Sequence, residues 1–207
     1  MSSPPTTRLR YVALGDSYTI GTGLADARDR WPDRLVRALE GRPVGLELVA
    51  NLGVNGFTSG ALIQRELPAL AAHRAAFISV LIGVNDVVQQ VPPAAYRTNA
   101  VAILDRLAEF VPASRILAVG IPDYTVTPQG AHYGDPTRQS AAIHAANVAL
   151  GELATERSIA FVDILDISLA AATDPSLVAG DGLHPSGAQY ELWVERILPV
   201  VTELLSD

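Results

Sequence analysis

Five short apolar runs recur along the chain, and each is followed by a longer segment with a different pattern. The runs cover residues 9–14, 46–50, 77–82, 116–120 and 160–163 and are rich in valine, isoleucine and leucine. Polar residues hardly interrupt them, which is typical of strands that are buried on both faces. The pattern therefore predicts five strands of a parallel sheet.

The segments between these runs carry apolar residues at spacings of three and four, as amphipathic helices do. They cover residues 31–40, 58–72, 94–110, 138–157 and 187–205. The first has Pro32 near its start and Gly41 after its end, which are common helix boundaries. Repeated strand–helix alternation predicts an α/β fold, a three-layer α/β/α sandwich with a five-stranded parallel sheet. Ligands of such sheets bind beyond the carboxyl ends of the strands.

The composition agrees with a packed globular protein. Of the 207 residues, 49% are hydrophobic and 18% are charged, so we expect one domain over residues 1–207, with residues 1–8 as a flexible N-terminal segment. The net charge of −7 without a basic patch argues against nucleic acid or an anionic membrane as a partner.

Cysteine is absent, which excludes disulfides, thiolate catalysis and cysteine metal sites. No apolar stretch has the length of a membrane span, about 18 residues, and no signal-peptide pattern opens the chain. We therefore expect a cytoplasmic protein, with secretion left open if a leader has been removed. The sequence does not indicate an oligomeric state.

Two short motifs near opposite ends of the chain carry candidate chemistry. Ser17 follows the first apolar run, and Asp181 and His184 precede the last predicted helix. A serine hydroxyl becomes a nucleophile only beside a base that is itself oriented by a third group, so the motifs predict a Ser-His-Asp arrangement. Asp163, at the end of the fifth run, is the alternative partner for His184. Asp16 more readily braces the turn by accepting backbone hydrogen bonds.

Two further segments follow the second and third predicted strands. Residues 51–56 are rich in glycine, which lets a backbone N–H approach a ligand, and Asn85 carries a side-chain donor. Both also suit ordinary turns. Of the other histidines, His73 and His144 are expected to be structural or exposed, and the loop that carries His132 is placed to overhang the site. No metal-ligand pattern or nucleotide-binding motif occurs, so we expect no metal and no cofactor.

Taken together and in this order, the four segments resemble the GDSL or SGNH hydrolase superfamily, and the resemblance covers nearly the whole chain. A tyrosine replaces the leucine of the family's first motif. The segments that carry the resemblance are Gly15-Asp16-Ser17-Tyr18, Gly56, Gly83-Val84-Asn85-Asp86 and Asp181-Gly182-Leu183-His184-Pro185.

The resemblance implies a flavodoxin-like α/β/α fold and metal-free ester hydrolysis through a covalent acyl-enzyme. Ser17 would be the nucleophile, His184 would take its proton and return it to the leaving alcohol, and Asp181 would hold the imidazole. The oxyanion hole would consist of the backbone N–H groups of Ser17 and Gly56 and the side chain of Asn85.

The substrate is less well defined by the sequence. Residues 121–136 form the longest irregular segment at the expected site, so Tyr124 and Tyr133 are predicted to line a binding groove. Residues 87–93 offer a second wall, with Val87 as its candidate contact. Since no apolar lid is evident, we predict short acyl groups, from acetyl to about hexanoyl. An acetylated sugar, a lysophospholipid, a thioester and a small metabolite ester all stay open.

Three other functions fit parts of the pattern. The first is a catalytically silent flavodoxin-like module that binds a small molecule. The second is an acyltransferase that uses the same three residues with an alcohol acceptor. The third is a protease with the same triad, although nothing in the sequence favours amide cleavage.

Overall fold

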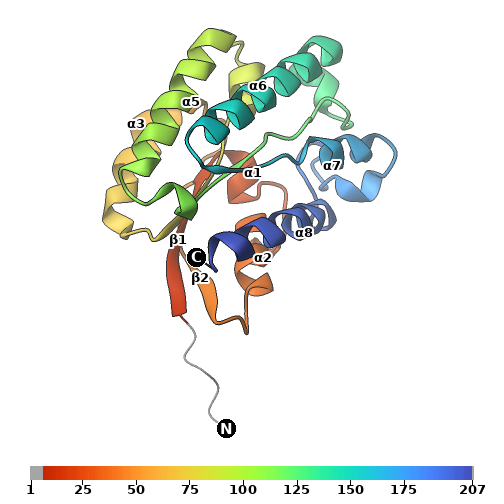
Figure 1. The fold of residues 1–207 in the computed structure, drawn as a ribbon. Helices are drawn as coiled ribbons and strands as arrows, with labels where there is room; N and C mark the ends of the chain where they lie inside the picture. Colours follow the sequence, from red (N-terminus) through yellow and green to blue (C-terminus); the bar gives the residue numbers. More distant parts are fainter. Residues whose placement is uncertain (1–6, 207) are drawn as a thin grey trace.

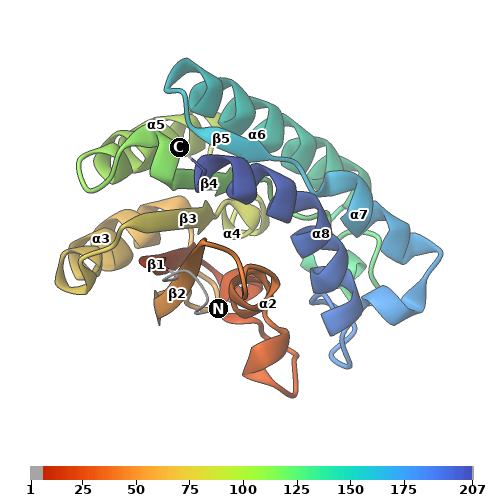
Figure 2. The same cartoon turned by 60° about the horizontal axis from the view of Figure 1, so that its bottom comes forward.

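The central feature of the protein is a parallel sheet that lies among the helices (Figure 1). It has five strands in the order β2-β1-β3-β4-β5, and all five are labelled in Figure 2. The computed structural model describes residues 7–206. All five predicted strands are present, which confirms the predicted fold class. The strands are β1 (Thr7–Gly15), β2 (Val44–Asn51), β3 (Phe77–Leu81), β4 (Ile116–Val119) and β5 (Ala160–Val162).

The five predicted helices are also present, with ends that differ by a few residues from the expected ones. They are α2 (Trp31–Ala38), α3 (Ser59–Leu70), α5 (Pro93–Ala108), α6 (Pro136–Glu156) and α8 (Gly187–Leu204). Three short helices, α1 (Ser17–Ile20), α4 (Val84–Val88) and α7 (Leu165–Leu169), were not expected. Each has only four or five residues, too few to establish a helical period in the sequence.

Helices cover both faces of the sheet, as Figure 2 shows: α3, α5 and α6 lie on one side, and α2 and α8 on the other. Alternate residues of β1 supply the two cores. Tyr11 and Ala13 join the cluster that contains residues of α2 and α8, whereas Val12 and Leu14 join the cluster of α3, α5 and α6. Burial on both faces explains why the strands read as unbroken apolar runs.

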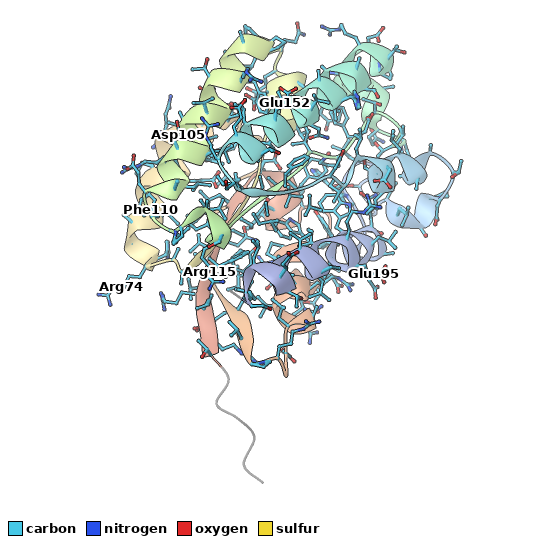
Figure 3. The ribbon with its side chains drawn as sticks, viewed as in Figure 1. Arg74, Asp105, Phe110, Arg115, Glu152 and Glu195 are labelled. Carbon is cyan, nitrogen blue, oxygen red and sulfur yellow. The ribbon has the colours of Figure 1, made fainter. Side chains whose placement is uncertain are left out.

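Ion pairs on the outer surface join the neighbouring helices α5 and α6. Arg157 Nε lies 2.6 Å from Asp105 Oδ1, and Arg97 Nη1 lies 3.4 Å from Glu152 Oε2. Figure 3 labels Asp105 on α5 and Glu152 on α6. These pairs are exposed, and exposed pairs contribute only about 0–1 kcal/mol each, so packing of the apolar faces determines this helix pair.

The sheet begins earlier in the chain than expected. Thr7 and Arg8 pair with Val44 and Gly45 of β2, so these two residues belong to β1 and not to a flexible segment. Residues 1–6 of that expected segment lie outside the described residues. No helix between residues 7 and 206 is both long enough and apolar enough to cross a membrane.

Candidate active site

A tight turn after β1 presents Ser17 at the carboxyl edge of the sheet. Gly15 has φ +153°, and a Cβ there would lie 2.3 Å from the carbonyl oxygen of Leu81, so only glycine fits. Asp16 caps α1, because its Oδ1 accepts a hydrogen bond of 3.0 Å from the Tyr18 N–H. The cap places Ser17 as the first residue of α1, with 7% of its surface exposed.

Two backbone donors at this edge are free to bind a ligand. Gly56 adopts a left-handed conformation, φ +78°, in the loop between β2 and α3. Neither its N–H nor that of Ser17 donates a hydrogen bond to another residue of the range 7–206. Both residues line the same pocket, so both N–H groups are candidates for binding a developing negative charge.

Asn85 lies in the first turn of α4 and connects the loops that follow three strands. Its Nδ2 donates to the Phe57 carbonyl oxygen at 3.0 Å and to Asp16 Oδ2 at 3.3 Å. Next to it, Asp86 accepts hydrogen bonds from the backbone N–H and the hydroxyl of Ser59, at 2.7 and 2.5 Å. These contacts fix α4 against the start of α3 and hold Asn85 beside the turn that carries Ser17.

The loop after β5 brings His184 to the same edge. Its Nδ1 lies 2.6 Å from Asp181 Oδ2, while Asp181 Oδ1 accepts the backbone N–H groups of Leu183 and His184 at 2.9 and 3.0 Å. The ring of Tyr18 packs beside the imidazole, with centroids 5.3 Å apart. Asp163, the alternative partner, instead accepts the Leu165 N–H at 2.9 Å.

Ser17 and His184 line one pocket of about 240 Å³ without a hydrogen bond between them in this structure. Such contacts are commonly long until substrate binds. Of the predicted substrate-contact residues, Tyr124 and Tyr133 also line this pocket. Val88, from the predicted second wall over residues 87–93, lines it as well. The remaining lining residues are Tyr18, Thr22, Asn55, Gly56, Val84, Asn85 and Leu183.

Val87, the third residue predicted to contact the substrate, does not line this pocket. Val84 and Val88 are four residues apart on α4, so they share the face that lines the pocket. Val87 lies on another face and lines a separate, larger groove of about 430 Å³ together with residues of α5 and α6. The spacing of four between residues 84 and 88 indicates a shared face only in a helix, and the sequence did not predict that residues 84–88 are helical.

The two tyrosines of the irregular segment pack against each other, with ring centroids 5.9 Å apart. Tyr124 is buried and Tyr133 is 44% exposed. Their segment also contacts the histidine loop, because the Gln129 N–H donates to the Gly182 carbonyl oxygen at 3.0 Å. His132 lies 2.5 Å from Gln129 Oε1 through its Nδ1 and is not among the residues that line the pocket.

Two carboxyl groups near Ser17 and His184 have pKa values shifted in opposite directions. Burial raises the pKa of Asp16 to about 7 and outweighs its hydrogen bonds from Tyr18 and Asn85. For Asp181, burial also raises the pKa, but the hydrogen bonds from Leu183 and His184 outweigh it and leave the pKa below its usual value. An ionised Asp181 only accepts hydrogen bonds, so His184 Nδ1 donates to it and Nε2 is left without the proton, as an acceptor.

Glu66 of α3 is a third carboxyl group at this turn, and the sequence analysis missed it. Its Oε2 accepts the Gly15 N–H at 2.8 Å, and its buried Oε1 has no hydrogen-bond partner. Burial raises its pKa to about 8. Within the part of the chain that the structure describes, no group of histidine, aspartate or glutamate side chains is arranged to hold a metal ion.

Solved structures with the same fold come from several enzymes. TesA is 24% identical with a TM-score of 0.72, and the match covers 95% of this chain and 99% of TesA. A catalytic mutant of Axe2, an acetylxylan esterase from Geobacillus stearothermophilus, is 18% identical with a TM-score of 0.73, and the match covers 95% of each chain. The psychrotrophic esterase EstA from Pseudoalteromonas sp. is 18% identical with a TM-score of 0.70, and the match covers 96% of this chain and 99% of EstA.

Comparison with curated protein sequences gives no match. The sequence model of the GDSL-like Lipase/Acylhydrolase family, in contrast, matches residues 13–192, which include the serine, glycine, asparagine and histidine segments of the pocket. The chain belongs to the GDSL-like lipase/acylhydrolase family.

Proposed function

We propose that this hydrolase is a serine esterase that cleaves short-acyl carboxylic esters through a covalent acyl-enzyme. The main support is the 2.6 Å contact between His184 Nδ1 and Asp181 Oδ2, in a pocket that also contains Ser17. This contact leaves His184 Nε2 directed at other partners, which is the arrangement that a general base for a serine hydroxyl needs.

In the proposed reaction, Ser17 Oγ attacks the ester carbonyl carbon while His184 Nε2 takes the hydroxyl proton. The carbonyl oxygen becomes an oxyanion, to which the N–H groups of Ser17 and Gly56 and the Asn85 amide donate. The C–O bond to the alcohol then breaks, and the imidazolium returns its proton to the leaving oxygen. A water molecule, deprotonated by His184, attacks the acyl-enzyme in the same way and releases the acid and free Ser17. No metal or cofactor takes part in these steps.

The size and lining of the pocket support short acyl groups. Its volume of about 240 Å³ is small, and its apolar wall consists of side chains such as Val84, Val88 and Leu183. The acetylxylan esterase and the psychrotrophic esterase among the structural neighbours are consistent with ester substrates.

The test is hydrolysis of p-nitrophenyl acetate, butyrate, octanoate and palmitate by the wild type and by Ser17→Ala. We expect the highest kcat/KM for acetate or butyrate and a steep fall at octanoate, and we expect no turnover above background in Ser17→Ala. Equal rates in the two proteins would contradict the assignment of the nucleophile. A rise in kcat/KM toward octanoate and palmitate would contradict the short-acyl assignment alone.

A matched pair of variants tests whether this pocket selects the acyl group. Val88→Trp fills the pocket and should lower the butyrate-to-acetate ratio of kcat/KM about tenfold or more, as expected for a loss of one to two kcal/mol of acyl binding. Val87→Trp adds the same bulk on another face of α4 and should leave the ratio unchanged. A larger effect from Val87→Trp would assign the acyl group to the neighbouring groove.

A further inference from the structure

The Asn85 amide has no free hydrogen in the resting structure. A primary amide nitrogen carries two N–H bonds. One points to the Phe57 carbonyl oxygen at 3.0 Å and the other to Asp16 Oδ2 at 3.3 Å. If Asn85 is to donate to an oxyanion, as the proposed function requires, one of these two bonds has to be exchanged.

The bond to Asp16 is the one suited to exchange. It is the longer of the two, and hydrogen bonds weaken as they lengthen beyond about 3.0 Å. Asp16 is also held independently of Asn85, because its Oδ1 accepts the Tyr18 N–H at 3.0 Å as the cap of α1. Loss of the contact at Oδ2 therefore leaves the carboxyl group and the adjacent Ser17 in place.

We propose that Asp16 is a positioning residue. It orients the Asn85 amide in the resting enzyme, and one N–H of that amide exchanges its hydrogen bond to Asp16 for a hydrogen bond to the substrate oxyanion. No covalent bond changes in this exchange: the N–H of Asn85 turns from Asp16 Oδ2 to the oxyanion as negative charge develops there. The inference rests on the proposed function. It gives the aspartate of the Gly-Asp-Ser segment a role beyond capping α1.

The surroundings of Asp16 make a purely structural role unsuitable. Its side chain is fully buried, and the ionisable groups that act on it or feel its charge are all acidic or phenolic, without a cation. These groups are Asp86, Glu66, Tyr18, Tyr96 and Tyr190. A buried carboxyl group without a cation destabilises a fold, and such groups are commonly retained for activity.

The test is a double-mutant cycle with Asp16→Asn and Asn85→Ala on p-nitrophenyl acetate. The amide of Asp16→Asn can keep the cap to Tyr18 with its oxygen, but it then presents N–H₂ toward Asn85, which cannot accept from it there. We expect kcat to fall about tenfold with little change in KM, and Asn85→Ala to lower kcat about a hundredfold. The double variant should be no slower than Asn85→Ala, because Asp16 acts through Asn85.

The melting temperature gives a second readout that separates positioning from folding. Asp16→Asn should have a melting temperature close to that of the wild type at pH 8, since removal of a buried charge offsets the cost of two amide donors that face each other. Asp26→Asn is the control: Asp26 also caps a short helix, through the Arg28 N–H at 2.8 Å, but it lies outside the pocket and its partner Arg28 is exposed. The variant should leave kcat unchanged and lower the melting temperature little, since it removes only an ion pair at the surface. Asp16→Ser, which keeps a capping oxygen and cannot reach Asn85, should lower kcat as Asp16→Asn does.

Effects on kcat that multiply in the double variant would overturn the proposal, because Asp16 would then act independently of Asn85. A large loss of melting temperature in both Asp16→Asn and Asp16→Ser would also overturn it and leave Asp16 a folding role only. These outcomes differ from failure of the proposed function, in which the wild type would have no esterase activity or Ser17→Ala would retain it.

Discussion

Two aspartates belong to the candidate site, one next to Ser17 in the chain and one in contact with His184, and their surroundings differ sharply. The Asp181 side chain is 34% exposed and accepts three hydrogen bonds, from His184 Nδ1 and from two backbone N–H groups. Asp16 is 0% exposed and accepts hydrogen bonds from the Tyr18 N–H and the Asn85 amide. The pKa of Asp181 lies below its usual value, whereas that of Asp16 is raised to about 7.

The difference shows that two opposing effects decide whether each carboxyl group is ionised: the hydrogen bonds that it accepts and the solvation that it loses on burial. Asp181 is ionised at neutral pH, so it can hold the His184 imidazole in one tautomer and stabilise its charged form. Asp16 loses more solvation than its donors return, so it destabilises the fold when it is ionised. Asp181 is therefore suited to orient the His184 imidazole, and Asp16 to accept a hydrogen bond from the Asn85 amide.

The largest expected effects come from the histidine side of this comparison. His184→Ala should lower kcat by about 10⁴-fold or more, and Asp181→Asn by about 10³-fold, because the base is lost in the first and misoriented in the second. Steady-state hydrolysis of p-nitrophenyl acetate measures both.

Asp163→Asn is the matched control for Asp181→Asn, because Asp163 caps the Leu165 N–H and has no contact with His184. We expect its kcat to equal that of the wild type. A greater loss in Asp163→Asn than in Asp181→Asn would reverse the assignment of the acid.

A smaller effect is expected from Glu66→Gln, and it concerns the pH dependence of stability. Its pKa is about 8 in the fold against 4.5 in a model peptide, and that of Asp16 is about 7 against 3.8. Since the folded state binds more protons than the unfolded chain between about pH 4 and 8, stability should fall as pH rises through that range. Glu66→Gln keeps an acceptor for the Gly15 N–H and should reduce this fall, with kcat close to that of the wild type.

Thermal unfolding between pH 5 and pH 8.5 measures this effect. The exposed residue Glu47 provides the control, since Glu47→Gln should leave the pH dependence unchanged. If Glu66→Gln lowered the melting temperature at pH 8.5, the ionised carboxylate would stabilise the turn, and the raised pKa would be wrong.

Much of the fold was predictable because buried parallel strands and long amphipathic helices leave strong patterns in the sequence. The candidate site residues Ser17 and Asn85 were predictable for a related reason, since each closely follows a strand and the carboxyl ends of parallel strands meet at one edge. His184 was predictable from its motif with Asp181, although α7 and two short 3₁₀ helices separate it from β5. Structure then brought Ser17, Asn85 and His184 into one pocket and left Asp163 outside the contact with His184.

The features that escaped prediction depend on three-dimensional contacts between separate segments. Val87 lies away from the pocket because residues 84–88 form the helix α4. A helix of five residues is too short to leave a periodic pattern of apolar residues in the sequence. Glu66 reads as an ordinary polar position of α3, and only its contact with the Gly15 N–H reveals that it is buried. The bond between Asp16 and Asn85 joins residues 69 positions apart.

The most direct test of the central claim is covalent capture of the nucleophile. Ethyl p-nitrophenyl methylphosphonate would transfer its phosphonyl group to an activated serine oxygen with release of p-nitrophenolate, and peptide mass spectrometry would locate the adduct. We predict one adduct per chain on the peptide that contains Ser17, none in Ser17→Ala, and much slower labelling in His184→Ala. Labelling of another residue in the wild type, or ester hydrolysis that persists after Ser17 is fully modified, would contradict the account.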